Sequence, residues 1–272
     1  GRGAKWSGAG DAVKKLAGRI GALIATTLMA KGLLAEDEYH VGISGTYGTR
    51  ASMKLFEEAD CVIAVGASMG RYTIEHGYLY PNARYVQIDS KPHVVMAGGR
   101  SADCYIQADA KAGVEGLDKL LEERSFKNVG YRTPDVRKQL AGQYEDRREY
   151  PIDPGTVDPR EVIRVLNQTV PTSMSLFTGS GATAGFSNIM FSRQRPLVMP
   201  SHFFGCIGQM MPAAMGAVVS TGNKPARLGG GGSAASGRCR RRLRSHRPAA
   251  EGRTRCVRGD VGVCSRRAAR AA

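Results

Sequence analysis

Short glycine motifs that follow apolar runs are the features of this sequence best suited to bind a ligand. Gly179-Ser180-Gly181 follows the apolar run 175–178, which is of strand type. Backbone N–H groups exposed at the end of a strand can bind an anion such as a phosphate group. The same three residues could instead form an ordinary turn, and on their own they favour that simpler interpretation.

A second group of glycine and polar residues lies at predicted strand ends in the first half of the chain. It comprises Gly1-Arg2-Gly3, Thr26-Thr27, Gly66 and Asp89. In doubly wound α/β proteins, ligands bind beyond the carboxyl ends of the strands. The set therefore predicts that a ligand site in this half would lie along one edge of a sheet.

Residues 1–125 are predicted to form an α/β domain with a Rossmann-like, doubly wound sheet. The helical spacing of apolar residues predicts helices over 11–21, 51–59 and 114–123. Continuous apolar runs predict strands over 23–28, 61–65 and 85–88. This alternation, with glycines at the strand ends, is typical of the doubly wound class.

The remainder of the chain is predicted to contain a linker, a second and truncated α/β domain, and a tail. Residues 126–157 are polar and rich in proline, and read as a linker with one helix over 135–144. Residues 158–228 are expected to open with a helix that Asp158 caps, with Val162, Val165 and Leu166 on its apolar face. Further strands are expected at 175–178 and 197–199, and a helix behind a glycine turn at 205–220.

The net charge of +15 is concentrated in residues 229–272, which contain 12 arginines and two acidic residues. This segment has no apolar periodicity, so we expect a disordered tail. It could be a basic arm that binds nucleic acid, with affinity that falls steeply with salt. Translation of a GC-rich gene in the wrong frame explains its composition better, and we do not expect nucleic-acid binding.

Cysteine usage and hydropathy indicate a cytoplasmic protein. The six cysteines include no C-x-x-C pair, so neither a zinc site nor a disulfide framework is predicted. Cys61, Cys104 and Cys206 are expected to be small core residues. No run of 18 apolar residues predicts a membrane span. The chain starts with Gly1 inside a glycine motif, so we expect sequence to precede it.

Five stretches of residues 1–228 resemble, in matching order, the thiamine-diphosphate-dependent enzyme superfamily. They are ATTLMAKG (25–32), GISGTYGT (42–49), EEADCVIAVGA (57–67), PNARYVQID (81–89) and FGCIGQMMPAAMGA (204–217). The first four resemble the central domain of acetolactate synthases and benzoylformate decarboxylase-like enzymes. The fifth resembles the beginning of their C-terminal, diphosphate-binding domain. The resemblance implies a fragment: a central domain without its first strand, followed by the start of the diphosphate-binding domain.

The resemblance implies thiamine diphosphate and Mg²⁺ as cofactors, 2-oxo acids as substrates of decarboxylation or carboligation, and a homo-oligomer. The implied cofactor-binding residues are Gly179, Ser180, Gly181, Gly205, Cys206 and Ile207. The glutamate that activates the cofactor belongs to a domain outside this sequence, and four glycines stand where the family has its Gly-Asp-Gly metal motif. We therefore expect no catalytic residue, no metal ligand and no turnover by this chain.

Acetolactate synthases also bind FAD at the central domain. The implied positions are Gly1, Gly3, Thr27, Leu28, Asp89 and Asp109. Asp89 could accept a hydrogen bond from a ribose hydroxyl. Ser68, however, stands where the family has arginine, which removes a cationic donor. FAD therefore stays an open alternative, as does a different function for residues 1–125, a non-catalytic module that binds FAD or ADP.

Overall fold

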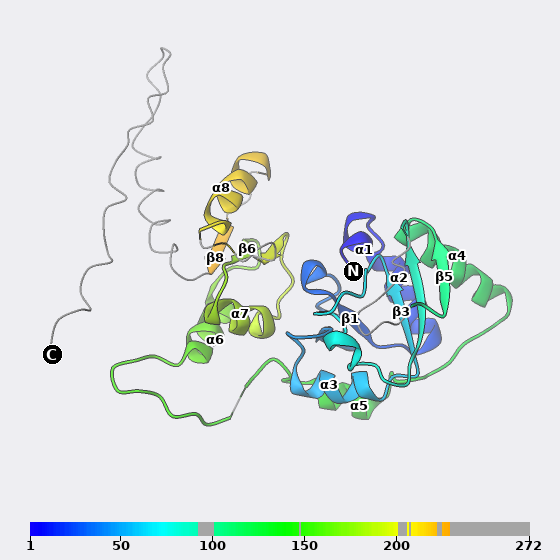
Figure 1. Ribbon diagram of the computed structural model, residues 1–272, viewed down its shortest axis with the longest axis horizontal. Coiled ribbons are helices and arrows are strands. Elements are labelled where there is room, and N and C mark those ends of the chain that lie inside the picture. The colour runs from blue at the N-terminus through cyan, green and yellow to red at the C-terminus, as the bar shows by residue number, and fades with distance from the viewer. Residues whose placement is uncertain (92–100, 147, 201–205, 207, 222–224, 229–272) are drawn as a thin grey trace, which may run out of the picture. The chain divides into compact units, whose positions relative to one another are not determined.

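The computed structural model describes residues 1–91, 101–146, 148–200, 206, 208–221 and 225–228 (Figure 1). Gly1–Ala234 form one compact unit. The predicted domain bounds at 125, 157 and 228 stay predictions. The tail at 229–272 lies outside the described residues, so its predicted disorder stays a prediction.

The first 140 residues alternate helices and strands, which confirms the α/β prediction. The elements are α1 (Arg2–Trp6), α2 (Gly10–Ile20), β1 (Ile24–Thr26), η1 (Leu28–Ala30), β2 (His40–Ile43), α3 (Arg50–Glu57), β3 (Cys61–Val65), η2 (Glu75–Gly77), β4 (Arg84–Asp89), β5 (Cys104–Gln107), α4 (Ala110–Glu123) and α5 (Pro134–Leu140). The sequence pattern does not predict β2 or β5, because HVGI and CYIQ lack a continuous apolar run. The glycine motif Gly1-Arg2-Gly3, which the sequence places at a strand end, forms the beginning of helix α1.

The strands of this part form two parallel sheets. One has the order β1-β2, and the other has the order β3-β4-β5. In the larger sheet β3 pairs with β4 from Cys61↔Arg84 to Val65↔Ile88, and β4 pairs with β5 from Val86↔Cys104 to Asp89↔Gln107. All pairs are parallel, as expected for strands covered by helices on both faces.

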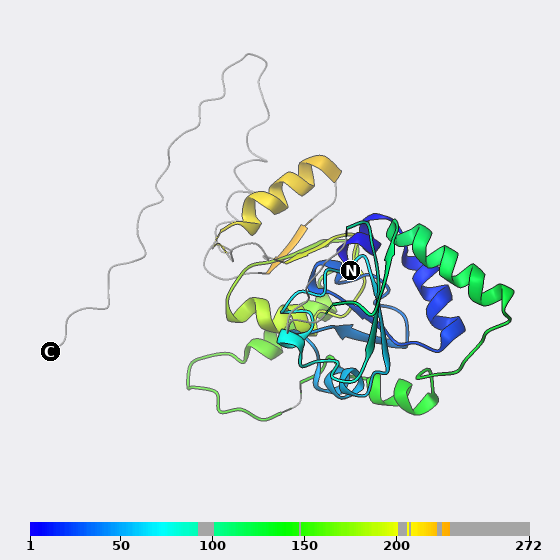
Figure 2. The same cartoon turned by 45° about the vertical axis from the view of Figure 1, so that its right-hand side comes forward.

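Helices cover the two faces of the larger sheet, as in a doubly wound fold. On one face α2 and α4 lie side by side (Figures 1 and 2), and their residues Leu16 and Val114 pack with Val65 and Ile88. On the other face α3 and α5 contribute to a second core, with Leu55, Phe56, Tyr85 and Leu140 among its buried members. The burial of large apolar side chains on both faces stabilises this arrangement.

Residues 158–228 contain α6 (Pro159–Thr169), β6 (Ser175–Thr178), α7 (Ala182–Met190), β7 (Val198–Pro200), α8 (Met210–Thr221) and β8 (Pro225–Leu228). Their parallel sheet has the order β7-β6-β8. Asp158 caps α6 by accepting a hydrogen bond from the amide of Arg160, as predicted. This cap fixes where the helix begins.

Two predictions about burial are wrong. Val162 and Val165 are 41% and 46% exposed; the buried face of α6 carries Ile163, which packs with β6 and α7 through Leu176 and Met190. Cys61, Cys104 and Cys206 are exposed rather than core residues. The first two begin β3 and β5, which have a neighbouring strand on one side only among the described residues.

Candidate functional site

The predicted anion-binding motif lies between the middle strand of the second sheet and the next helix. β6 ends at Thr178, and α7 begins at Ala182 with Gly181 as its N-cap. Gly181 has φ = 90°, a conformation that favours glycine, and no atom lies within 4 Å of where its Cβ would be. Glycine at position 181 therefore permits this backbone conformation, and open space lies beside the motif.

The first turn of α7 can supply hydrogen-bond donors to an anion. The first amides of a helix have no acceptor inside the helix, and the helix dipole makes this end positive. Gly181 caps α7 through its backbone only, since no side chain accepts a hydrogen bond there. Thr178 Oγ1 donates to Asn188 Oδ1 over 3.2 Å, which ties the helix to the strand. The arrangement fits a phosphate or diphosphate group.

The three strands of this sheet end at the same edge. Thr178 of β6 is opposite Pro200 of β7 and Leu228 of β8, so the segments after all three strands leave from one edge. Cys206 is exposed and precedes Gly208, whose φ is 87°. Gly205 and Ile207 lie outside the described residues, so the structure does not test their predicted positions.

Among the described residues, those around this edge do not fit a Mg²⁺ site. Magnesium prefers oxygen ligands, above all carboxylates. In the sequence, β8 is followed by four glycines, 229–232. Within the described residues there is no group of three or more His, Cys, Asp or Glu side chains that could hold a metal ion. The described residues at this edge therefore offer no group of carboxylates that would anchor a diphosphate through a metal.

The glycines predicted to contact FAD are used in backbone packing within the chain. The amide of Gly3 donates to the carbonyl of Gly66 over 3.0 Å. A Cβ on Gly3 would lie 2.9 Å from Gly66 Cα, and one on Gly1 would lie 2.2 Å from Gly66 O. The close approach of α1 to the end of β3 therefore explains both glycines without a nucleotide.

The two acidic residues of this set lie along the carboxyl edge of the larger sheet. Asp89 ends β4, and one carboxylate oxygen accepts from the amide of Lys91 over 3.3 Å. Asp109 caps α4, and its Oδ1 accepts from the amides of Lys111 and Ala112. Helix capping thus accounts for Asp109, and these contacts give the FAD site no support.

Thr27 and Leu28, the other predicted FAD positions, follow β1 in the smaller sheet. Thr27 is the N-cap of η1, and Leu28 is its first residue. The structure brings Gly1, Gly3, Asp89 and Asp109 to the strand ends of one sheet and places Thr27 and Leu28 at the end of another. The six residues thus lie at the strand ends of two sheets, and Gly1 and Thr27 line the same cavity.

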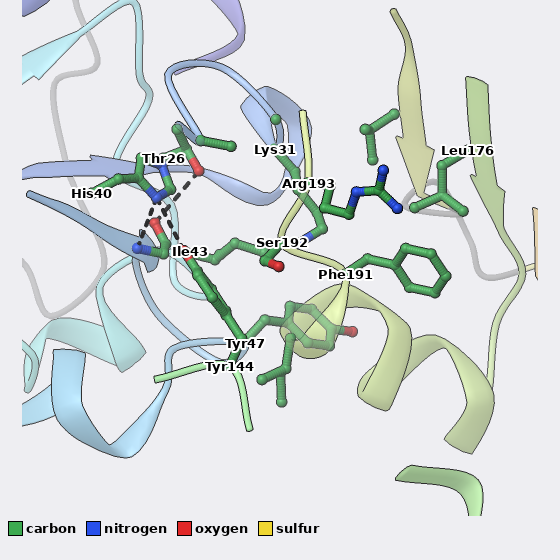
Figure 3. Close-up of a pocket in the computed structure, with 15 residues that line it drawn as sticks. Thr26, Lys31, His40, Ile43, Tyr47, Tyr144, Leu176, Phe191, Ser192 and Arg193 are labelled. Carbon is green, nitrogen blue, oxygen red and sulfur yellow. Dashed lines mark hydrogen bonds between the residues drawn. The ribbon is translucent and has the colours of Figure 1, made fainter. Parts of the chain in front are cut away.

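A buried cluster around His40 was not predicted from the sequence. His40 Nδ1 accepts from the amide of Gly42 over 3.1 Å and lies 3.1 Å from the Tyr144 hydroxyl (Figure 3). Burial lowers the pKa of His40 to about 4, and the charge of Lys31 acts in the same direction. Burial alone lowers the pKa of Lys31 to about 7. Perturbed groups of this kind occur at functional sites and in structural networks alike.

The sequence around Lys31 and His40 gives little indication that these residues form a buried cluster. Lys31 lies in the apolar sequence LMAKGLL, which is the only hint of its burial. His40 lies in a short strand without an apolar run, and Gln143 Nε2 donates to its carbonyl from more than 100 residues away. A long-range contact of this kind has no local sequence pattern.

Comparison with known families decides between the interpretations of the first part of the chain. Residues 1–117 match the family described as thiamine pyrophosphate enzyme, central domain. This part of the chain is similar to the central domain of the thiamine-diphosphate-dependent enzymes. The Rossmann-like fold of this part agrees with the family, as the sequence resemblance implies.

Curated relatives of the family extend the similarity beyond the central domain. A sulfoacetaldehyde acetyltransferase of Alcaligenes xylosoxydans xylosoxydans is 27% identical over 250 residues, which cover 80% of this chain and 41% of the relative. An acetolactate synthase of Mycobacterium leprae is 27% identical, covering 77% and 34%. A probable acetolactate synthase large subunit of Methanocaldococcus jannaschii is 29% identical, covering 79% and 37%. The chain thus spans about two fifths or less of these relatives.

No helix within the described residues combines the length and the hydropathy that a membrane crossing requires.

Proposed function

We propose that the chain supplies the central domain and the first strands of the diphosphate-binding domain to an enzyme that decarboxylates or ligates 2-oxo acids with thiamine diphosphate. The observation that carries this proposal is the position of Gly181. It combines a positive φ with open space at the start of α7, directly after the middle strand of a parallel sheet. This is where an α/β fold binds phosphate groups.

The residues of the chain would bind and orient the cofactor. Thiamine diphosphate, when bound, supplies the carbon that adds to the substrate carbonyl and accepts the electron pair left by decarboxylation. The amides at Gly179, Ser180 and Gly181 would hold diphosphate oxygens. Gly205 and Cys206 would contact the aminopyrimidine through the backbone, and Ile207 would support the ring as an apolar contact.

The names of the relatives favour an acetyl unit as the group that the enzyme handles. They are acetolactate synthases and sulfoacetaldehyde acetyltransferases. A homo-oligomeric assembly and a cytoplasmic location remain predictions. Because the described residues do not supply Mg²⁺ ligands, we expect the chain alone to bind the cofactor without turning over a 2-oxo acid.

FAD binding and a non-catalytic nucleotide-binding function are less well supported. Gly1, Gly3 and Asp109 each have a structural role within the chain. If FAD or ADP bound to the chain more tightly than thiamine diphosphate in a titration, nucleotide binding would become the better supported function.

Calorimetric titration of the full chain with thiamine diphosphate tests the proposed function. Thiamine, which lacks the diphosphate, serves as the ligand control. Gly181→Ala should weaken binding of thiamine diphosphate at least tenfold. Gly155→Ala is the matched variant, because Gly155 also has a positive φ, 79°, and open space around it, but lies in the loop before α6. Equal binding of thiamine, or unchanged binding by Gly181→Ala, would contradict the proposal.

A further inference from the structure

A small cavity lies beside the side chains of Lys31 and His40 (Figure 3). Its volume is about 10 Å³, which is enough for one particle of the size of a water molecule. β1 contributes Thr26 to its wall, and β2 contributes Gly42 and Ile43 in addition to His40. The largest occupant that this space admits is therefore one water molecule or one single-atom ion.

The hydrogen bond from the Gly42 amide determines which nitrogen of His40 carries a hydrogen. Nδ1 accepts from this amide over 3.1 Å, so the hydrogen of the neutral ring is on Nε2. His40 is 6% exposed, and its Nε2 is buried without a hydrogen-bond partner among the described residues. Buried donors in native proteins are nearly always paired. The Nε2–H group of His40 therefore calls for an occupant that accepts a hydrogen bond.

Lys31 is a buried amine without a carboxylate beside it. It is 7% exposed. Burial lowers its pKa to about 7, and no neighbouring negative charge among the described residues raises it again. Buried charges in proteins are either paired or neutralised. Lys31 therefore loses its proton readily, unless an anion lies next to it.

The cavity has no negative charge of its own. No aspartate or glutamate is among the described residues that line it. The acidic residue that acts on His40 from outside the cavity is Asp37. One oxygen of Asp37 lies 3.5 Å from Arg132 Nη2 and accepts from the amide of Tyr39 over 3.0 Å. Its charge is thus already balanced by another residue.

Two residues on another part of the wall add a donor and a positive charge. Ser192 Oγ accepts from Asn167 Nδ2 over 3.3 Å, so the hydroxyl hydrogen of Ser192 is left to donate. Arg193 donates through Nη1 to the carbonyls of Asn167 and Gln168, neither of which carries a charge. Hydrogen bonds from such donors are strongest to an ionised acceptor. The wall therefore favours an occupant that is negatively charged.

A water molecule would match the volume of the cavity but not its chemistry. Water donates two hydrogen bonds as well as accepting them, and it leaves the ammonium group of Lys31 without a counter-ion. Chloride is about as large as water, only accepts hydrogen bonds and supplies the missing charge. Phosphate, sulfate and carboxylate groups contain several heavy atoms and exceed the volume.

We propose that this cavity binds one chloride ion between the ammonium group of Lys31 and the Nε2–H group of His40. The ion connects the segment after η1 to β2. Because it binds the folded chain and has no such site in the unfolded chain, it raises the stability as its concentration rises. Chloride binding here is independent of the proposed binding of thiamine diphosphate.

Chloride binding should be linked to the proton of Lys31. The titratable or charged groups that face Lys31 and His40 are Lys5, Asp37, Tyr47, Tyr144 and Arg193. The pKa of His40 is about 4 and that of Tyr144 is about 12, so neither side chain changes its charge between pH 6 and pH 8. Lys31, with its pKa of about 7, does. Since chloride binds the protonated amine, its affinity should be about tenfold higher at pH 6 than at pH 8.

The thermal midpoint of the full chain in sodium chloride and in sodium gluconate, at one ionic strength, tests the site. Gluconate is too large for the cavity, so the difference between the two salts reports binding there. As chloride replaces gluconate, the midpoint should rise to a plateau, by roughly 2–5 °C. The rise should be half complete at a lower chloride concentration at pH 6 than at pH 8. Bromide should act as chloride does.

Two variants remove the two sides of the site. Lys31→Met removes the amine and keeps an unbranched side chain, and it should abolish the difference between the salts. His40→Asn keeps an acceptor for the Gly42 amide but lacks the Nε2–H group, and it should weaken chloride binding about tenfold. Lys14→Met is the matched control, because it removes the same charge from an exposed position of α2. Circular dichroism establishes that all three variants are folded.

Three results would overturn the proposal. Equal midpoints of the unchanged chain in the two salts would assign the cavity to a water molecule. A chloride effect that persists in folded Lys31→Met would exclude Lys31 from the site. A chloride effect that Lys14→Met removes as completely as Lys31→Met does would attribute it to the net charge of the chain.

Discussion

Arg19 Nε lies 2.6 Å from a carboxylate oxygen of Asp118, whose side chain is 5% exposed, and this pair joins α2 to α4. Lys15 reaches the same carboxylate from one turn earlier, at 2.8 Å. The hydrogen bond from Arg19, followed by the one from Lys15, holds the pKa of Asp118 below its ordinary value, against the opposing effect of burial. The two helices that cover one face of the larger sheet are thus connected by a buried carboxylate.

Asp118→Asn should lower the free energy of unfolding by about 1–3 kcal/mol, since charged hydrogen bonds are lost while Arg19 stays in place. A carboxylate with a lowered folded pKa stabilises the fold above its unfolded pKa of about 3.9, and this contribution disappears as the pH falls. Urea unfolding at pH 7 and pH 3 should therefore show a smaller difference between variant and parent at the lower pH. Asp135→Asn, at an exposed position, is the control, and an equal loss there would refute the assignment.

Gly3→Ala should destabilise the chain, while Gly18→Ala should stabilise it by about 0.5–1 kcal/mol. A Cβ on Gly3 would meet the backbone of Gly66 at 2.9 Å, whereas one on Gly18, inside α2, would meet no atom within 4 Å. Thermal unfolding of the two variants compares the same chemical change in a crowded and an open helix. If Gly3→Ala were as stable as Gly18→Ala, the close approach of α1 to β3 would be wrong.

Asp109→Ala should reduce stability by about 0.5–2 kcal/mol, the usual effect of losing a helix cap. Asp109→Asn should restore most of the loss, because its side-chain oxygen can still accept from the amides of Lys111 and Ala112. Urea unfolding in the absence of nucleotide is the measurement. If neither change altered the stability while both weakened FAD binding, Asp109 would be a cofactor-binding residue rather than a helix cap.

The stability of the chain should decrease as His40 takes up a proton. Its pKa is about 4 in the folded chain and about 6.5 when unfolded. A group that binds its proton less tightly in the folded state contributes fully above pH 6.5, and this contribution falls between pH about 6.5 and about 4. Protonation would place a hydrogen on Nδ1, which accepts from the amide of Gly42.

His40→Asn should flatten this part of the stability profile, since the Asn side-chain oxygen can accept from Gly42 and does not titrate. Thermal midpoints between pH 4 and pH 7 are the measurement. His76→Asn provides the comparison, because His76 has φ = 57°, which Asn tolerates. If His76→Asn removed the pH dependence of the thermal midpoint and His40→Asn kept it, His76 rather than His40 would be the titrating group, and the prediction would be wrong.

Local patterns predicted those parts of the fold that depend on neighbouring residues. The run CVIAV became β3, and Asp158 followed by Pro159 marked the start of α6, because apolar runs and caps act within a few residues. Such local patterns failed where contacts between residues distant in the sequence determine which side chains are buried. They could not show that β3 has a neighbouring strand on one side only among the described residues, and so they misplaced Cys61 in the core. They also put Val162 and Val165 on the face of α6 that turned out to be exposed.

The candidate site shows the same division. Gly181 could be predicted because a strand followed by glycine and a helix is a local pattern. The glycines at 1 and 3 were also recognised as unusual, but their reason, the backbone of Gly66, lies more than 60 residues away. The surroundings of His40 depend on Gln143 and Tyr144, about a hundred residues further along the chain.

Three hydrogen bonds that join the two sheets of the first part of the chain differ in the length of chain that each encloses. Ser44 and Thr73 are 29 residues apart, Tyr131 and Glu58 are 73 apart, and Arg132, which donates to the carbonyl of Ala22, is 110 residues from it. Closing a longer loop costs more entropy, although the cost grows only with the logarithm of its length. The sheets should therefore come together first at the Ser44 end during folding. The Tyr131 end should open first during native-state fluctuations, so its amides would exchange with solvent earliest.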